Sequence, residues 1–259
     1  MCVCARAYSP LGPGVVFLLC GFACVASERA LVVGDSWASY SLQSLQESCD
    51  SITEVENRGI AGTTAAQWAA RHNCETDSSS QCCQSSKSCS LFDVTFEPGF
   101  TYAWVSIGGN DFFEMACSMD VNRLTSVQQS IEQVLADLQF LSANTKIILT
   151  GYAVPKGPLT WHPSPACSSI TALEPLNAAV KRAAQAWGAT FVDVSESMGG
   201  NTTHWSQTDF FRDSIHLNAA GYTQLWSTPA LQEAFQCVLS NARAAGILIS
   251  FLMLGFAVL

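Results

Sequence analysis

The stretch ALVVGDSW, residues 30–37, decides the fold, because it joins an apolar run to a turn and then to helix-favouring sequence. Residues 30–33 are short, continuous and apolar, which is typical of a strand buried on both faces of a parallel sheet. The run stops at Gly34, and a helix is expected from Trp37. Ser36 is therefore expected at a strand-to-helix turn on the open edge of a sheet, where a helix N-terminus favours developing negative charge.

Further segments alternate between strand and helix patterns. Strands are predicted at residues 53–57, 102–107, 146–150 and 190–194, and helices at residues 37–47, 63–71, 123–143, 171–187, 218–226 and 230–239. Residues 152–169 are predicted to be a long surface loop. In the longest helix, the apolar residues recur at spacings of three and four (Leu124, Val127, Ile131, Leu135, Leu138 and Leu141). In the helix at 37–47, the candidate inward residues are Trp37, Tyr40, Leu42 and Leu45. This alternation predicts an α/β fold with a parallel sheet covered on both faces.

Both ends of the 259-residue chain differ in composition from the rest. Residues 1–26 read as a secretory signal peptide, with a charged start, a short apolar run and a small residue before polar sequence. Residues 244–259 are uninterrupted apolar sequence, which suits either a GPI-attachment signal or a membrane anchor. Residues 27–243 are then expected to form one domain. The net charge of −9, with no basic cluster, argues against a nucleic-acid partner.

Cysteine usage indicates an oxidising compartment. Of the 12 cysteines, those of the mature chain are Cys49, Cys74, Cys82, Cys83, Cys89, Cys117, Cys167 and Cys237. Their even number in a secreted chain predicts up to four disulfides, of undetermined pairing. Residues 73–90 are read as an irregular, disulfide-tied loop. No cysteine or histidine spacing fits a zinc site, so neither metal nor cofactor is expected. The sequon at Asn201 is a candidate glycosylation site.

Two segments carry the elements of nucleophilic catalysis. A serine hydroxyl is a poor nucleophile unless a base lies within hydrogen-bond reach, and Ser36 has none nearby in sequence. Asp213-Ser214-Ile215-His216 offers a carboxylate three residues before an imidazole. In a tight turn, that carboxylate would hold the histidine tautomer and stabilise the imidazolium. Ser36, His216 and Asp213 are therefore the predicted catalytic residues, against the alternative that the aspartate and histidine are ordinary loop residues.

Residues that follow two other predicted strands are candidates to stabilise the oxyanion formed during acyl transfer. Hydrogen-bond donors must point toward this oxyanion before it forms. Gly62 follows the second strand, where a glycine lets its N–H approach a ligand closely. Asn110 follows the third strand and offers a side-chain amide. With the N–H of Ser36, these are the predicted oxyanion donors.

GDSW, the glycine of RGIAGTT, GGND and DSIH, in this order, resemble the four signature blocks of the SGNH (GDSL-type) hydrolases. The resemblance covers the mature chain from Ala30 to about Leu239. It implies a three-layer α/β/α sandwich of flavodoxin-like arrangement and metal-free esterase or lipase activity. It also implies that Ser36, Asp213 and His216 are the catalytic residues. The oxyanion donors that it implies are Ser36, Gly62 and Asn110. Trp37 stands where the family has leucine, and the cysteine-rich stretch has no counterpart, which leaves the substrate class open.

Other residues are given structural roles or left open. Asp35 is expected to order the turn around Ser36, and Asp111 to bond backbone near Asn110. The remaining histidines (His72, His162 and His204) have no metal-ligand spacing. Trp104 is expected in the core. The candidates for a pocket wall, with ordinary packing as the alternative, are Trp161, Trp205, Phe210 and Phe211.

These observations predict a secreted or cell-surface serine esterase that acts through an acyl-enzyme on Ser36. The substrate is expected to be a small-molecule or polysaccharide ester, with lipid and O-acetylated carbohydrate both open. An acyltransferase with the same triad is the alternative, followed by an inactive binding module. Acyl-chain length, disulfide pairing and oligomeric state are open at this level.

Overall fold

The computed structural model of the protein describes residues 2–3, 23–24, 28–42, 44–71, 89–92, 99–168, 173–200 and 204–237. The apolar tail, the sequon at Asn201 and most of the cysteine-rich loop lie outside the described residues, as does most of the expected signal peptide. Within the latter, β1 (Cys2–Val3) pairs antiparallel with β2 (Ala23–Cys24). Within the described ranges, no helix has the length and apolarity to cross a membrane.

The centre of the fold is a five-stranded sheet in the order β4-β3-β5-β6-β7, with every neighbouring pair parallel. Its strands are β3 (Glu28–Gly34), β4 (Ile52–Asn57), β5 (Tyr102–Ser106), β6 (Lys146–Thr150) and β7 (Thr190–Val192). All five residues of β5 are buried, as an apolar strand in the middle of a covered sheet requires. The five predicted strands are all present.

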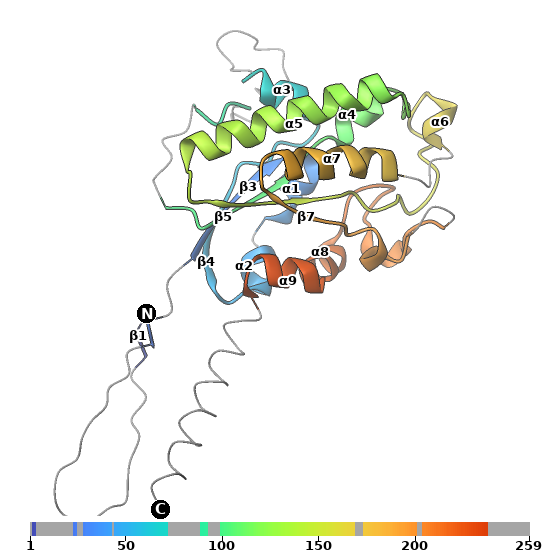
Figure 1. The fold of residues 1–259 in the computed structure, drawn as a ribbon. Coiled ribbons are helices and arrows are strands. Elements are labelled where there is room, and N and C mark those ends of the chain that lie inside the picture. The colour runs from blue at the N-terminus through green and yellow to red at the C-terminus, as the bar shows by residue number, and fades with distance from the viewer. Residues whose placement is uncertain are drawn as a thin grey trace, which may run out of the picture.

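Helices cover both faces of the sheet (Figure 1), which confirms the expected three-layer α/β/α fold. On one face lie α3 (Ala65–Ala69), α4 (Gly109–Glu114), α5 (Val121–Leu141) and α7 (Glu174–Ala186). On the other lie α2 (Ser44–Ser48), α8 (Ala219–Trp226) and α9 (Pro229–Ala234). The shorter elements are α1 (Ser36–Ser41), α6 (Pro165–Ser168) and two 3-10 turns, Glu196–Met198 and Thr208–Phe210.

The turn after β3 depends on a glycine. Gly34 has φ 136°, and a Cβ at this position would lie 1.9 Å from the carbonyl oxygen of Ser106 in β5. The same carbonyl accepts a hydrogen bond from the N–H of Asp35 at 2.9 Å. Only glycine allows this backbone conformation and this approach together. The close contact between β3 and β5 therefore fixes the position at which α1 begins.

Two disulfides whose cysteines both lie within the described residues tie distant segments of the chain. Cys49 pairs with Cys237, and Cys117 pairs with Cys167. Cys89 is also disulfide-bonded. The other three cysteines of the expected disulfide set (Cys74, Cys82 and Cys83) lie outside the described residues.

The predicted helix at 37–47 was wrong in one respect, because it is broken into α1 and α2. Leu42 ends α1 with φ 45° and ψ -120°, a conformation outside the helical region that interrupts helical hydrogen bonding. Its side chain is 67% exposed and does not face inward as expected, whereas Trp37 and Leu45 are buried. The predicted loop at 152–169 likewise contains the short helix α6.

Candidate active site

The segment that carries Asp213 and His216 is a closed turn. An antiparallel bridge joins Phe211 to Leu217, and the Arg212 N–H donates to the His216 carbonyl at 3.0 Å. Inside the turn, Asp213 Oδ1 accepts the N–H of Ile215 at 3.0 Å and that of His216 at 2.8 Å. An aspartate side chain commonly closes a turn over the residues that follow it. The DxxH spacing therefore lets the Asp213 side chain close the turn that carries His216.

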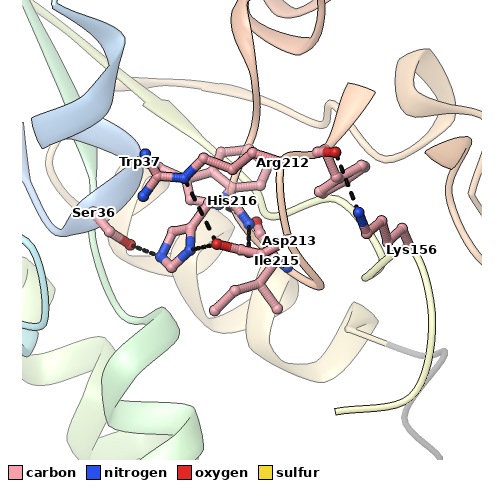
Figure 2. A network of polar contacts seen from close by, with 8 residues as sticks. Ser36, Trp37, Lys156, Arg212, Asp213, Ile215 and His216 are labelled. Atoms are coloured by element: carbon pink, nitrogen blue, oxygen red, sulfur yellow. Dashed lines mark hydrogen bonds and ion pairs between the residues drawn. The ribbon is translucent and has the colours of Figure 1, made fainter. Parts of the chain in front are cut away.

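The hydroxyl and the imidazole that the sequence separates by 180 residues are in contact. Ser36 Oγ lies 3.0 Å from His216 Nε2, and His216 Nδ1 lies 2.7 Å from Asp213 Oδ2 (Figure 2). Ser36 is 7% exposed and begins α1 directly after the Gly34 turn. Both contacts are within the range for a nucleophile, a base and the group that orients the base.

Trp37 holds the two parts of this site together. Its indole Nε1 donates to the carbonyl of Ile215 at 3.0 Å, and its own carbonyl accepts the hydroxyl of Tyr222 at 2.7 Å. The ring also packs edge-to-face on Tyr152, with centroids 5.4 Å apart. The residue after Ser36 thus anchors the histidine turn through a bond that a leucine could not make. Sequence reasoning missed this role, since it depends on a contact across 178 residues.

Asp213 is partly exposed and stays ionised. Burial acts to raise the pKa of its carboxyl, but the backbone N–H groups of His216 and Ile215 and the imidazole outweigh that cost and lower the pKa. Arg212 Nε lies 3.6 Å from the same carboxylate. The guanidinium stacks over Tyr40 at 3.8 Å, and Tyr40 meets the His216 ring edge-on. A charged Asp213 can therefore stabilise an imidazolium.

Both expected oxyanion residues line the cleft at Ser36. Asn110 Nδ2 donates one hydrogen bond to the carbonyl of Thr63 at 2.8 Å, which fixes the plane of the amide and leaves its second N–H for another acceptor. Gly62 has φ 83° in the turn before α3. Thr64 caps that helix, with its hydroxyl accepting from Gln67 N and its N–H donating to the Gln67 side chain.

Asp111 bonds backbone beside Asn110, as expected, and also backbone of another helix. Its carboxylate interacts with its own backbone N–H, and it accepts the N–H of Ala65 at 2.6 Å and that of Ala66 at 3.2 Å, across to the first turn of α3. Burial raises its pKa, while these N–H groups act in the opposite direction. Asp111 thus ties α4 to α3, the elements that follow the Asn110 and Gly62 turns.

Asp35 orders the turn at Ser36, as expected, and is buried. Its Oδ1 accepts the N–H of Trp37 at 3.0 Å, and its Oδ2 accepts the hydroxyl of Tyr152 at 2.5 Å. Burial raises the pKa of Asp35 to about 7, despite these two hydrogen bonds. Tyr152 comes two residues after β6 and was missed, although the same rule of looking at strand ends would have found it.

Two spaces meet at Ser36. A narrow cavity is mainly apolar and is lined by Phe112, Phe113, Tyr152, Leu173, Leu176 and Ile215, among others. A wider, more open cleft is lined by Ser36, Tyr40, Gly62, Asn110, Trp161, Asp213, Ser214 and His216, with Ala61 and Ile215. Ser36, Asn110 and Ile215 border both spaces.

The aromatic candidates for a pocket wall differ in whether they line a space at Ser36. Trp161 lines the cleft, whereas Trp205, Phe210 and Phe211 line neither space. Phe211 is buried beside the histidine turn, so it holds that turn in place. Trp104 is fully buried, as expected.

Among the described residues, His162 and His204 are not placed as metal ligands. His162 bonds the carbonyl of Phe113 through Nε2 at 3.1 Å, and His72 lies outside the described residues. His204 is exposed. In the part of the chain that the structure describes, no cluster of histidine, cysteine and acidic residues suits a metal ion.

Comparison with known proteins places this arrangement in a family. Residues 25–224 match the model of the GDSL-like Lipase/Acylhydrolase family. Among solved structures, a GDSL-like lipase from Bacteroides thetaiotaomicron VPI-5482 shares 18% identity over 81% of this chain and 88% of its own, with a TM-score of 0.55. A mutant of an acetyl-xylooligosaccharide esterase from Geobacillus Stearmophilus shares 17% identity over 82% of this chain and 95% of its own, with a TM-score of 0.52. No curated protein matches the chain significantly.

The raised pKa of Asp35 predicts a stability change with pH. Between pH 3.8, the ordinary pKa of an aspartate, and about pH 7, the folded protein keeps the proton that the unfolded chain releases, so the free energy of unfolding falls as pH rises through this window. Asp35→Asn should abolish this contribution, worth up to about 4 kcal/mol. The measurement is urea unfolding at pH 4.5 and pH 7.5.

The exposed Asp50 supplies the control, since Asp50→Asn should keep the pH dependence of the wild type. An Asp35→Asn variant that loses stability between the two pH values by as much as wild type would contradict the assignment. The new amide can still donate to the Tyr152 oxygen, so a folded variant is expected.

The anchoring bond of Trp37 predicts a selective loss of turnover. Trp37→Phe keeps an aromatic ring against Tyr152 but removes the donor to Ile215, so the histidine turn should loosen. We expect kcat for p-nitrophenyl acetate to fall about tenfold with KM nearly unchanged, and stability to fall by about 1 kcal/mol.

Trp226→Phe is the matched control, because Trp226 is also buried and donates its indole N–H, to Ser44 Oγ at 2.9 Å, away from the triad. It should lose comparable stability and keep wild-type kcat. Equal kinetic effects in the two variants would reduce the role of Trp37 to general packing.

Proposed function

Because the chain belongs to the GDSL-like lipase/acylhydrolase family, we propose that it is a serine ester hydrolase whose catalytic residues are Ser36, His216 and Asp213. One observation carries the assignment of residues. Ser36 Oγ lies 3.0 Å from His216 Nε2, while Asp213 occupies the other ring nitrogen at 2.7 Å. That order of nucleophile, base and orienting carboxylate is the arrangement that acyl transfer through a serine requires.

In the first half-reaction, His216 Nε2 takes the Ser36 proton as Oγ bonds to the ester carbonyl carbon. The carbonyl electron pair moves onto oxygen, and the imidazolium is stabilised by the ionised Asp213. When the tetrahedral intermediate collapses, the bond to the alcohol breaks and His216 returns the proton to the leaving oxygen. Water, deprotonated by His216, then attacks the acyl-enzyme and releases the acid, with the proton restored to Ser36.

The oxyanion of the intermediate needs donors that are in place before the reaction. We assign this role to the backbone N–H groups of Ser36 and Gly62 and to the Asn110 amide. Ser36 begins α1, so its N–H has no acceptor within that helix. The Asn110 amide is held by its bond to Thr63, so one N–H remains for the substrate.

The two spaces at Ser36 suit the two parts of an ester. The narrow apolar cavity beside Ser36 suits the acyl group, and its narrowness favours a short chain. The open cleft is placed to take the alcohol, because His216, which protonates the leaving oxygen, lines the cleft and not the cavity. Acyl transfer to a second alcohol stays the sequence-based alternative.

The test is chemical labelling of the nucleophile with a kinetic readout. Ser36→Ala should lower the hydrolysis of p-nitrophenyl acetate by about 10⁴-fold or more and abolish the mass increase caused by a fluorophosphonate. Ser214→Ala is the matched control, since Ser214 lines the same cleft. It should keep both the label and most of the activity. A label found on another residue, or activity retained in Ser36→Ala, would overturn the assignment.

We also propose that the protein works outside the cytosol, secreted or at the cell surface. The support is its disulfides, Cys49–Cys237 and Cys117–Cys167, since such bonds persist in oxidising compartments.

Expression of the full chain in eukaryotic cells tests this location. We expect the protein in the medium, or accessible to a membrane-impermeant biotin reagent, with both cysteine pairs linked in peptide mass spectra. Release by phosphatidylinositol-specific phospholipase would favour a GPI anchor over a spanning one. Recovery in the cytosol with free thiols would refute the proposal.

A further inference from the structure

Trp161 occupies an unusual position for an indole. It is 54% exposed, and it lines the open cleft together with Ser36 and His216. Burial of such a side chain in the core would stabilise the fold by a few kcal/mol, and here that gain is largely unused. The exposed ring presents a flat apolar face to whatever enters the cleft.

The loop that carries Trp161 is held firmly to α4. The disulfide Cys117–Cys167 ties the chain after α4 to α6, just beyond Trp161 in sequence. His162 Nε2 bonds the Phe113 carbonyl at 3.1 Å, and Ser164 Oγ donates to the Ala116 carbonyl at 3.2 Å.

The indole itself rests on a ring of α4. Phe113 packs edge-to-face against Trp161, with centroids 5.5 Å apart, and also lines the narrow cavity beside Ser36. The position of Trp161 relative to the nucleophile is therefore set before any ligand arrives, which lowers the entropy cost of binding on it.

The rest of the cleft combines apolar surface with hydrogen-bonding groups. The Asn110 amide, the Asp213 carboxylate and the Ser214 hydroxyl line it, beside Tyr40, Ala61 and Ile215. A long hydrocarbon chain needs a continuous apolar groove, whereas an aromatic face combined with hydrogen-bonding groups suits a molecule with one apolar face and a hydroxylated rim.

We propose that Trp161 is the stacking platform for a sugar ring, so that the substrate is an O-acylated carbohydrate whose acyl group enters the narrow cavity. A pyranose has a face of C–H groups, whose partial positive charge is attracted to the negative face of the indole. Its hydroxyls can bond the polar groups of the cleft. The net charge of −9 favours a neutral sugar over an acidic one. This inference rests on the ester hydrolase function proposed above.

The test compares two acetate esters that differ in the alcohol. An acetylated methyl xyloside offers a sugar ring, whereas ethyl acetate offers none, and acid release is followed by pH-stat for both. Trp161→Ala should lower kcat/KM for the xyloside about tenfold or more, mainly through KM, and leave ethyl acetate within about twofold. Trp161→Phe, which keeps a ring, should recover part of the loss.

Phe140→Ala is the control for removing an exposed ring, because Phe140 is 80% exposed on α5 and lines neither space at Ser36. It should match wild type on both esters. Equal losses on both esters in Trp161→Ala, or no loss on the xyloside, would overturn the platform. Preferential turnover of trioctanoylglycerol by wild type, reduced in Trp161→Ala, would assign the cleft to a lipid instead.

A binding measurement separates this inference from the proposed function. Saturation-transfer NMR of the acetylated xyloside with Ser36→Ala should show contact of the ring C–H protons, lost in the Ser36→Ala/Trp161→Ala double variant. Contact without turnover by wild type would leave the platform standing and refute the hydrolase assignment. If wild type hydrolyses ethyl acetate but does not prefer the xyloside, and the ring protons show no contact, the hydrolase assignment stands and the sugar platform is refuted.

Discussion

Strand β3 pairs in parallel with β4 on one side and β5 on the other, and this double pairing determines where the reacting groups meet. Parallel strands end at the same edge of a sheet, so the segments after β3, β4 and β5 present Ser36, Gly62 and Asn110 side by side. The register opposes Gly34 to Ser106, at a separation that admits no side chain on Gly34. A slip of one residue would move Asn110 by about 3.3 Å relative to Ser36, more than a hydrogen bond tolerates.

The base comes from a part of the chain that no central strand positions. The turn carrying His216 is shaped by its own bonds, in which the Asp213 carboxylate accepts two backbone N–H groups. Its place relative to the nucleophile is set by other contacts, chiefly the indole of Trp37 on the carbonyl of Ile215. The site is thus an assembly of a rigid sheet edge and a self-closed turn. The contacts between them decide whether Ser36 and His216 stay within reach of each other.

Features encoded locally were predictable from the sequence. All five strands were predicted, most directly where an apolar run ends at turn residues, as at residues 30–33, and the spacing of apolar residues located α5 within a few residues. Leu42 was misjudged, because periodicity does not report a positive backbone φ at a single position. The partner of Asp111 and the anchoring bond of Trp37 depend on packing between distant elements. The choice of Trp161 over Trp205 as a cleft residue depends on the pairing of Cys117 with Cys167, one of many pairings that eight cysteines allow.

Two aspartates near Ser36 are held in opposite states, and this difference assigns their roles. Asp213 is partly exposed and has a lowered pKa, so it is charged wherever His216 must become an imidazolium. Asp35 is buried with a pKa of about 7, so in neutral and acidic solution it carries a proton for much of the time. A full negative charge at Asp35, one residue from the nucleophile, would oppose the oxyanion that forms on the substrate. Because Asp35 is buried beside Tyr152 and is often protonated, its carboxyl can stabilise the turn at Ser36 with little electrostatic repulsion of the oxyanion.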